Sequence, residues 1–335
     1  MSNANKVKNS DYIFLCANIR ARETRLLHKD RMTKMVEAPS YDEAVKYLID
    51  CDYPDMTGMD DVEIERTIAG HRKQIVSEVA RFCPEPVMLD AFRIRYDYHN
   101  IKVLVKSHGE HGNSEHLMSS CGIVDPDRMA ECYRTEEYDM LPDYIRDCLR
   151  DARATLARTG DPQRTDFGVD RAYYTQLLVM TRELSDDFYT EYVRWCIDAA
   201  NLRSAVRALR IGLDKAVLES AMIPGGHVET YMITDAAAGE RDLAFLFFAG
   251  PLQKAGELGV AAVEGASLTP FESECENALT RYLDRAKLVS IGSAPVLAFL
   301  DGLDSEIVAI RTILLAKKYG VSEQMLRERL RESYV

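Results

Sequence analysis

Residues 295–335 read PVLAFLDGLDSEIVAIRTILLAKKYGVSEQMLRERLRESYV, and this stretch contains the pattern on which the rest of the chain is built. Its apolar side chains recur at spacings of three and four residues, at Leu303, Ile307, Ile310 and Leu314. This spacing places them on one face of an α-helix. Glu306 and Arg311 fall away from that face. The stretch therefore predicts an amphipathic helix that also carries an acid and a base.

The acid and the base belong to a signature that occurs three times. In each copy an acid comes three residues before an amide or small residue, which is followed at once by an aliphatic residue and a base. The three copies are Asp97, Asn100, Ile101 and Lys102; Asp198, Asn201, Leu202 and Arg203; and Glu306, Ala309, Ile310 and Arg311. The amide or small residues of the three copies, Asn100, Asn201 and Ala309, lie 101 and 108 residues apart along the chain. A period this long is typical of a repeated small domain and not of a solenoid.

We therefore predict three similar helical modules, with boundaries at 1–112, 113–222 and 223–335. The alternation of polar and apolar residues that marks strands is nearly absent, so the predicted fold class is all-α. The segment 12–35 contains neither Pro nor Gly and predicts one long amphipathic helix. Ser40 followed by Glu43 predicts a helix N-cap with a capping box.

Composition narrows the functional classes. The chain has 335 residues, of which 47% are hydrophobic, and a formal net charge of −12. This charge disfavours non-specific binding to nucleic acid, which requires a surplus of clustered bases. The eight cysteines form no CxxC pair, so we expect reduced thiols in a cytoplasmic protein. The longest apolar run, residues 243–250, is far shorter than the roughly 20 residues that span a bilayer, so we expect a soluble protein.

One cluster could carry catalysis. His108, His111, His116 and Cys121 supply four side chains of the kind that bind zinc. Gly109 and Gly112 interrupt the segment, which favours a polar linker between modules. A stand-alone α-helical metalloenzyme that uses this cluster is the alternative hypothesis. No GxGxxG or GxxxxGK[ST] pattern occurs, so we expect no nucleotide cofactor.

The repeated acids allow a catalytic and a structural interpretation. Three nearly identical catalytic sites in tandem would be unusual for one enzyme. A buried acid that meets a base or an amide on a neighbouring helix would instead fix the register of the helices. We therefore predict that Asp97, Asp198 and Glu306 are structural, and we assign no residue of the chain a catalytic, cofactor-binding or metal-binding role.

Several separated blocks also resemble one known family. They are 19–23 (IRARE) with Leu26 and Leu27, 96–102 (YDYHNIK), 201–203 (NLR), Gly225 with Gly226, 271–279 (FESECENAL), Ile310 with Arg311, and 327–332 (RERLRE). In this order the blocks resemble the C subunits of the V/A-type ATPases and ATP synthases, which are equivalent to the d subunits of the eukaryotic V-ATPases. The third signature copy has Ala309 where that family usually has Asn.

The resemblance implies a funnel of three similar helical domains around a pseudo-threefold axis. It also implies a role in the central rotor of a rotary ion pump, peripheral to the cytoplasmic face of the membrane. There the chain would join the central-stalk subunits of D and F type to the membrane proteolipid ring and transmit torque for proton or sodium transport. Contact with the membrane would pass only through the ring.

Two sets of bases are candidates for contact surfaces. The first set recurs beside the apolar stripes of the modules and would either pair with acids or line a central cavity: Arg20, Arg22, Lys102, Arg203 and Arg311. The second set gives the C-terminal segment a local basic surplus in an acidic chain: Arg327, Arg329 and Arg331. We expect such charged contacts to be reversible and sensitive to salt.

Overall fold

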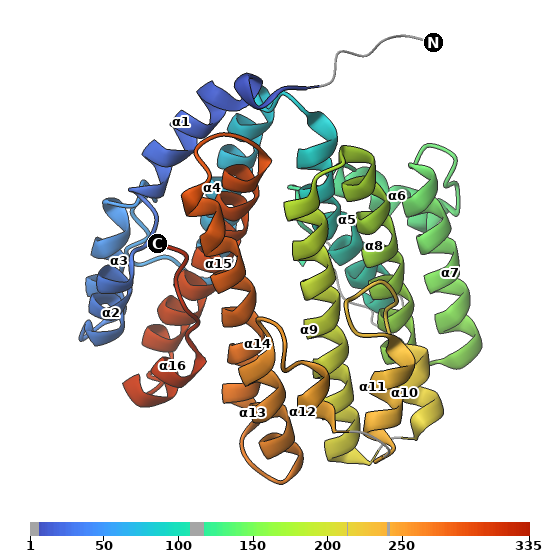
Figure 1. The fold of residues 1–335 in the computed structure, drawn as a ribbon. Helices are drawn as coiled ribbons and strands as arrows, with labels where there is room; N and C mark the ends of the chain where they lie inside the picture. Colours follow the sequence, from blue (N-terminus) through green and yellow to red (C-terminus); the bar gives the residue numbers. More distant parts are fainter. Residues whose placement is uncertain (1–6, 108–116, 213, 240–241) are drawn as a thin grey trace. The chain divides into compact units, whose positions relative to one another are not determined.

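The computed structural model describes residues 7–107, 117–212, 214–239 and 242–335 (Figure 1). Across these ranges every regular element is a helix, which confirms the all-α prediction. The chain divides into two compact units. Unit 1 combines Met1–Pro86 with Leu268–Val335, and unit 2 is Val87–Ser267.

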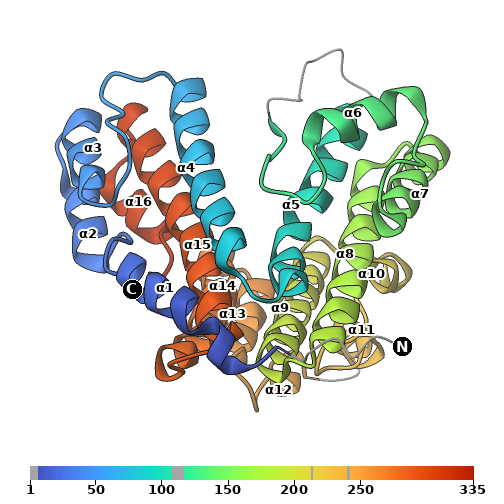
Figure 2. The same ribbon diagram turned by 90° about the horizontal axis from the view of Figure 1, so that it is seen from above.

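Unit 1 is built around one long helix, α15 (Ser293–Lys318). Residues 294–300 of α15 are all buried, as expected for a helix that neighbours surround. Those neighbours come from both ends of the chain (Figure 2). They are α1 (Ile13–Glu23), α3 (Tyr41–Ile49), α4 (Asp61–Phe82), α14 (Leu268–Leu283), η3 (Asp284–Leu288) and α16 (Glu323–Arg329). The unit also contains η1 (Asn9–Tyr12) and α2 (Lys29–Glu37), which packs on α3 and α16.

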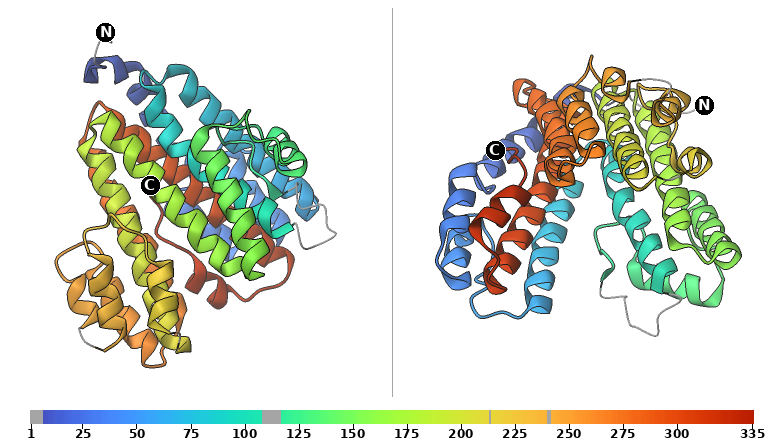
Figure 3. Two further views of the ribbon diagram at one scale, coloured as in Figure 1. Left: turned by 90° about the vertical axis from the view of Figure 1, so that its right-hand side faces the viewer. Right: turned by 90° about the horizontal axis from the view of Figure 1, so that it is seen from below.

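Unit 2 contains the first two copies of the signature. They lie on α5 (Pro86–Ser107) and α9 (Asp187–Ile211). The other helices are α6 (Pro126–Thr135), α7 (Asp143–Thr159), α8 (Pro162–Leu184), α10 (Lys215–Ala221), α11 (Thr230–Ala237), α12 (Leu243–Leu246) and α13 (Gln253–Val263). Helix α8 packs between α7 and α9, and α11 and α13 pack on α9 (Figure 3).

The single helix predicted over 12–35 is wrong, because the chain breaks after Glu23 into α1 and α2. The turn between them contains Leu26 and Leu27, which are 5% and 1% exposed. The N–H of Leu27 donates to the carboxylate of Glu306 and not to a carbonyl one helical turn earlier. A local amphipathic pattern cannot reveal such a partner. The break therefore reflects a tertiary contact.

The N-cap predicted for the next helix is confirmed, whereas the capping box is not, because the carboxylate of Glu43 pairs with Lys46. The hydroxyl of Ser40 accepts the N–H of Glu43 at 3.3 Å at the start of α3. Such a cap satisfies one of the N–H groups that have no partner at the first turn of a helix. Throughout the described ranges, none of the helices combines the length and the apolar character needed to cross a bilayer.

Candidate functional site

The acid of the first signature copy holds a loop. Asp97 on α5 is fully buried, and its two carboxylate oxygens accept the N–H groups of Ile123 at 2.9 Å and Val124 at 3.0 Å. One turn further along α5, Asn100 accepts the N–H of Ser119 at 2.7 Å and donates to the carbonyl of Ser119 at 2.9 Å. Helix α5 therefore satisfies the backbone of the loop that leads into α6.

The second copy repeats this geometry on α9. Asp198 is also fully buried, and it accepts the N–H groups of His227 at 2.9 Å and Val228 at 3.2 Å. Asn201 accepts the N–H of Ile223 and donates to the carbonyl of Ile223, both at 2.8 Å. The acid and the amide thus act together in both copies, and each pair fixes a loop that comes later in the chain.

A glycine allows each loop to approach its acid. A Cβ atom on Gly122 would lie 2.2 Å from an oxygen of Asp97, and one on Gly226 would lie 2.1 Å from an oxygen of Asp198. Both distances are far below van der Waals contact, so a side chain at either position would displace the carboxylate. Gly122 and Gly226 are therefore part of the repeated site.

The third copy is completed by the opposite end of the chain. Glu306 on α15 is 8% exposed and accepts the N–H of Leu27 and the hydroxyl of Tyr53, the latter at 2.7 Å. Leu27 and Tyr53 belong to the N-terminal part of unit 1, whereas Asp97 and Asp198 bind loops that follow them in the sequence. The N-terminal segment thus provides the loop of the third copy.

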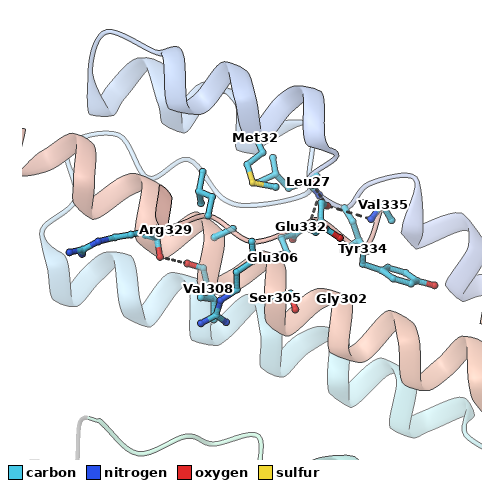
Figure 4. Close-up of a pocket in the computed structure, with 16 residues that line it drawn as sticks. Leu27, Met32, Gly302, Ser305, Glu306, Val308, Arg329, Glu332, Tyr334 and Val335 are labelled. Carbon is cyan, nitrogen blue, oxygen red and sulfur yellow. Dashed lines mark hydrogen bonds between the residues drawn. The ribbon is translucent and has the colours of Figure 1, made fainter. Parts of the chain in front are cut away.

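The C-terminal tail, residues 330–335, occupies the place of one missing side chain in this copy (Figure 4). Arg93 and Arg194, four residues before the acids of the first two copies, donate to loop carbonyls, whereas Gly302 stands at that place on α15. A Cβ on Gly302 would lie 2.7 Å from the ring of Tyr334. Ser333 and Tyr334 donate at 3.1 Å and 2.9 Å to the N-terminal segment, at the Leu27 carbonyl and the Glu23 carboxylate. The tail therefore fastens this segment to α15.

A cavity of about 170 Å³ lies between α15, the N-terminal segment and the tail. Its lining is mainly apolar, with Leu26, Met32, Ala309 and Leu330, and Glu306 reaches it from α15 (Figure 4). In the first two copies an Asn stands at the position of Ala309. The third site therefore differs from the others in lacking the amide and in having an open space beside the acid.

Burial controls the protonation of two of the three acids. Loss of hydration raises the pKa of Glu306 to about 7, although the hydrogen bonds from Leu27 and Tyr53 oppose this shift. Loss of hydration likewise raises the pKa of Asp97 to about 6, against the hydrogen bonds from Ile123 and Val124. Each oxygen of all three acids accepts a donor from the chain itself. This arrangement holds each acid to a segment of its own chain.

The expected partners of the acids need one correction. We expected a base or an amide on a neighbouring helix, but the main partners are backbone N–H groups of loops. The bases of the signature meet other groups. Lys102 pairs with Asp170 at 2.5 Å, and Arg311 forms a two-pronged pair with Glu65 at 2.5 and 2.7 Å. Arg203 is half-buried, and its charge acts on the hydroxyl of Tyr174.

The bases near the two ends of the chain are mostly paired within unit 1. Arg20 donates to Glu23 at 2.8 Å and to the carbonyls of Ala286 and Val289, both at 2.9 Å. Arg22 pairs with Glu78.

Three bases lie in and after α16. Arg327 pairs with Glu37 at 2.8 Å, and Arg331 pairs with Glu276. Arg329 is exposed beside the cavity. All three bases are exposed, and two of them, Arg327 and Arg331, are tied to acids of unit 1.

The zinc cluster of the alternative hypothesis gains no support. His108, His111 and His116 lie outside the described residues. Cys121 is 3% exposed, and its carbonyl accepts a hydrogen bond from Arg93 at 3.1 Å. Within the ranges that the structure covers, no group of three or more His, Cys, Asp or Glu residues could hold a metal ion.

Sequence reasoning missed the loops that the acids bind, although a signal was present. Residues 122–125 read GIVD and residues 226–229 read GHVE. In both copies a valine follows the glycine by two positions, and an acid comes directly after the valine. The N-terminal equivalent, Leu26-Leu27-His28, lacks this pattern. The third loop could therefore be found only from the structure.

Known proteins resemble the chain over nearly its whole length. The sequence profile of the ATP synthase (C/AC39) subunit family matches residues 15–329. The C subunit of the V-type sodium ATPase of Enterococcus hirae is 24% identical over 322 residues, covering 94% of this chain and 97% of that protein. The C subunit of the A-type ATP synthase of Thermococcus kodakarensis is 24% identical over 339 residues, covering 96% and 90%. Because the profile runs through both units and includes all three buried acids, the chain belongs to the ATP synthase (C/AC39) subunit family.

Proposed function

We propose that the chain is a non-catalytic adaptor in the central rotor of a V/A-type ATPase or ATP synthase. It joins the central-stalk subunits of D and F type to the membrane proteolipid ring and transmits torque for proton or sodium transport. The observation that carries this proposal is the family match over residues 15–329. The stand-alone metalloenzyme has no comparable support.

The chemistry of the buried acids supports a mechanical role. The carboxylates of Asp97, Asp198 and Glu306 accept hydrogen bonds from loops of the same chain. Each contact joins a long helix to a segment at least 26 positions away. Such ties limit the relative movement of helix and loop, which an element under torque requires.

Three modules remain our proposal for the organisation of the chain. The boundaries predicted from the sequence are 1–112, 113–222 and 223–335. The contacts of Glu306 with Leu27 and Tyr53 favour a third module that joins the C-terminal helices to the N-terminal ones. With the boundaries predicted from the sequence, Asp97 and Asp198 would each bind a loop that lies near the start of the following module.

We place the protein at the cytoplasmic face of the membrane, where it would touch the bilayer only through the ring. Arg329 would belong to a contact surface with a neighbouring protein of the complex, because its charge is exposed. Arg20, Arg22, Arg327 and Arg331 would contribute mainly by holding that surface in place, because each is paired within unit 1.

Purification of the tagged chain from its native membrane tests the proposal. We expect the proteolipid and the stalk proteins to be recovered with it and identified by mass spectrometry. Zinc content, measured on the same sample, should be far below one ion per chain. Recovery of the chain alone, with stoichiometric zinc, would contradict the adaptor and favour the metalloenzyme.

A further inference from the structure

One histidine distinguishes the second copy of the repeated site from the first. His227 follows Gly226 in the loop bound by Asp198, and the equivalent residue after Gly122 is Ile123. The Nδ1 atom of His227 lies 3.0 Å from Asp198, and its Nε2 atom lies 2.8 Å from Glu191 on the same helix. The imidazole is thus held between two carboxylates.

The two contacts are both satisfied only when the ring is protonated. A histidine cation donates from both nitrogens, whereas a neutral imidazole has one N–H and one lone pair. With carboxylates on both sides, the neutral ring must turn its lone pair towards an anion. Asp198 is fully buried and also receives the backbone N–H of His227, whereas the side chain of Glu191 is 44% exposed. Glu191 is therefore the partner that separates when the proton leaves.

The charges around the ring agree with this geometry. Asp198 and Glu191 raise the pKa of His227 above its usual 6.5, although partial burial and the positive charge of Arg194 act against them. The contact with His227 in turn lowers the pKa of Glu191. Helix α8 brings Leu178 against Gly225, and its charged Arg171 donates to the carbonyls of Ser220 and Met222 just before the turn. The acids and the base that act on the ring all lie on α9.

The ring also contacts an aromatic neighbour. His227 stacks on Trp195 with ring centroids 3.8 Å apart and an angle of 23° between the planes. A cation on an indole face is attracted by the ring quadrupole, so protonation strengthens the stack. A Cβ on Gly250 would lie 2.3 Å from the far edge of this indole, so the turn at 247–252 rests directly on Trp195.

We propose that His227 is a proton-operated latch within unit 2. When protonated, its ring ties α9 to the turn at 224–228 through Asp198 and Glu191, and holds the indole of Trp195 against the turn at Gly250. Loss of the proton releases Glu191 and weakens the stack, which loosens both turns. The inference concerns the isolated chain and does not depend on the proposed function.

Trp195 is the only tryptophan of the chain, so its emission reports on this site alone. An imidazolium stacked on indole quenches its fluorescence. We expect the emission of the full chain to rise in a single step as the pH is raised from about 5.5 to about 9, with a midpoint above the usual value for histidine. The step should disappear in His227→Ile, which copies the first loop, and in His227→Gln.

Two single variants should move the midpoint in opposite directions. Glu191→Gln removes a negative charge and should lower the midpoint by roughly half to one pH unit. Arg194→Gln removes a positive charge and should raise it. His71→Gln is the matched control, because His71 is a second aromatic-stacked histidine, against Tyr53 in unit 1, and its loss should leave the step unchanged.

Hydrogen exchange of the unmodified chain gives a test that no folding defect can obscure. After correction for intrinsic rates, the amides of 225–228, 247–250 and Leu252 should exchange faster at high pH than at low pH, while those of 119–124 should not. An emission step that persists in both His227 variants would overturn the latch. Equal protection of the two turns at both pH values would overturn it as well.

Discussion

The backbone N–H of Leu27 donates to the carboxylate of Glu306, although the two residues are 279 positions apart in the sequence. Tyr53 donates to the other oxygen of the same carboxylate at 2.7 Å. One buried acid on the long helix α15 thus binds two residues of the N-terminal segment, Leu27 and Tyr53.

The raised pKa of Glu306 predicts a pH-dependent contribution to stability. Its pKa is about 7 in the folded chain and near 4.5 in an unfolded one, so between these values the folded state binds more protons. The free energy of unfolding should therefore fall as the pH rises from 4.5 to about 7, by on the order of 3 kcal/mol, and level off above. Denaturant titrations at several pH values should show this fall reduced in Glu306→Gln. An identical pH profile for both proteins would contradict the prediction.

Removal of the repeated amide should destabilise unit 2. In Asn100→Ala the buried N–H and carbonyl of Ser119 lose their partners, which should cost about 1–3 kcal/mol. Asn201→Ala should have a similar effect through Ile223. Chemical denaturation followed by circular dichroism measures both. Gln324→Ala is the control, because Gln324 is an exposed amide and its loss should change stability by less than about 0.5 kcal/mol.

A methyl group on Gly302 should displace the C-terminal tail. The added Cβ would lie 2.7 Å from the ring of Tyr334, which cannot stay in place. We expect Gly302→Ala to accelerate removal of Val335 by carboxypeptidase. Gly70→Ala on α4 is the matched control, because a Cβ there meets nothing within 4 Å and should leave stability unchanged or slightly higher.

A second substitution separates this clash from a general defect. In Gly302→Ala with Tyr334→Ala, the ring atoms at 2.7 and 2.9 Å are gone, and the contact that remains is with the Cβ of residue 334 at 3.0 Å. The double variant should be no less stable than Tyr334→Ala alone. Additive losses in the double variant would show that Gly302 is required for another reason.

Charge reversal at Arg329 should weaken assembly without affecting the fold. Arg329 is exposed, whereas Arg327 and Arg331 pair with acids of unit 1. Arg329→Glu should therefore keep the wild-type melting temperature but co-purify less of its partners, most clearly at low salt, where exposed charges are least screened. The triple reversal of Arg327, Arg329 and Arg331 should lower the melting temperature as well. Wild-type recovery of partners with Arg329→Glu at all salt concentrations would exclude this residue from the interface.

The sequence by itself determined that the chain is helical and repeated. The spacing of Leu303, Ile307 and Ile310 follows from the period of a helix, which is a local property that neighbouring residues report. The acid with an amide three residues later appears twice in full, so the first two sites could be located on their helices. The sequence also showed that the third copy differs from the other two, because Ala309 stands where they have Asn.

Only the tertiary structure decided what each acid meets. The partner of a buried carboxylate is whichever donor the folded chain brings to it, and no local pattern links Glu306 to Leu27. The same contact explains why the helix expected over 12–35 breaks near Leu27, since its N–H serves the distant acid and not its own helix. The role that we propose for His227 depends on the fold, which places its ring between Asp198, Glu191 and Trp195. The period of a helix can be recognised from a few neighbouring residues. These contacts instead join residues that are far apart in the sequence, so they depend on the packing of the whole unit.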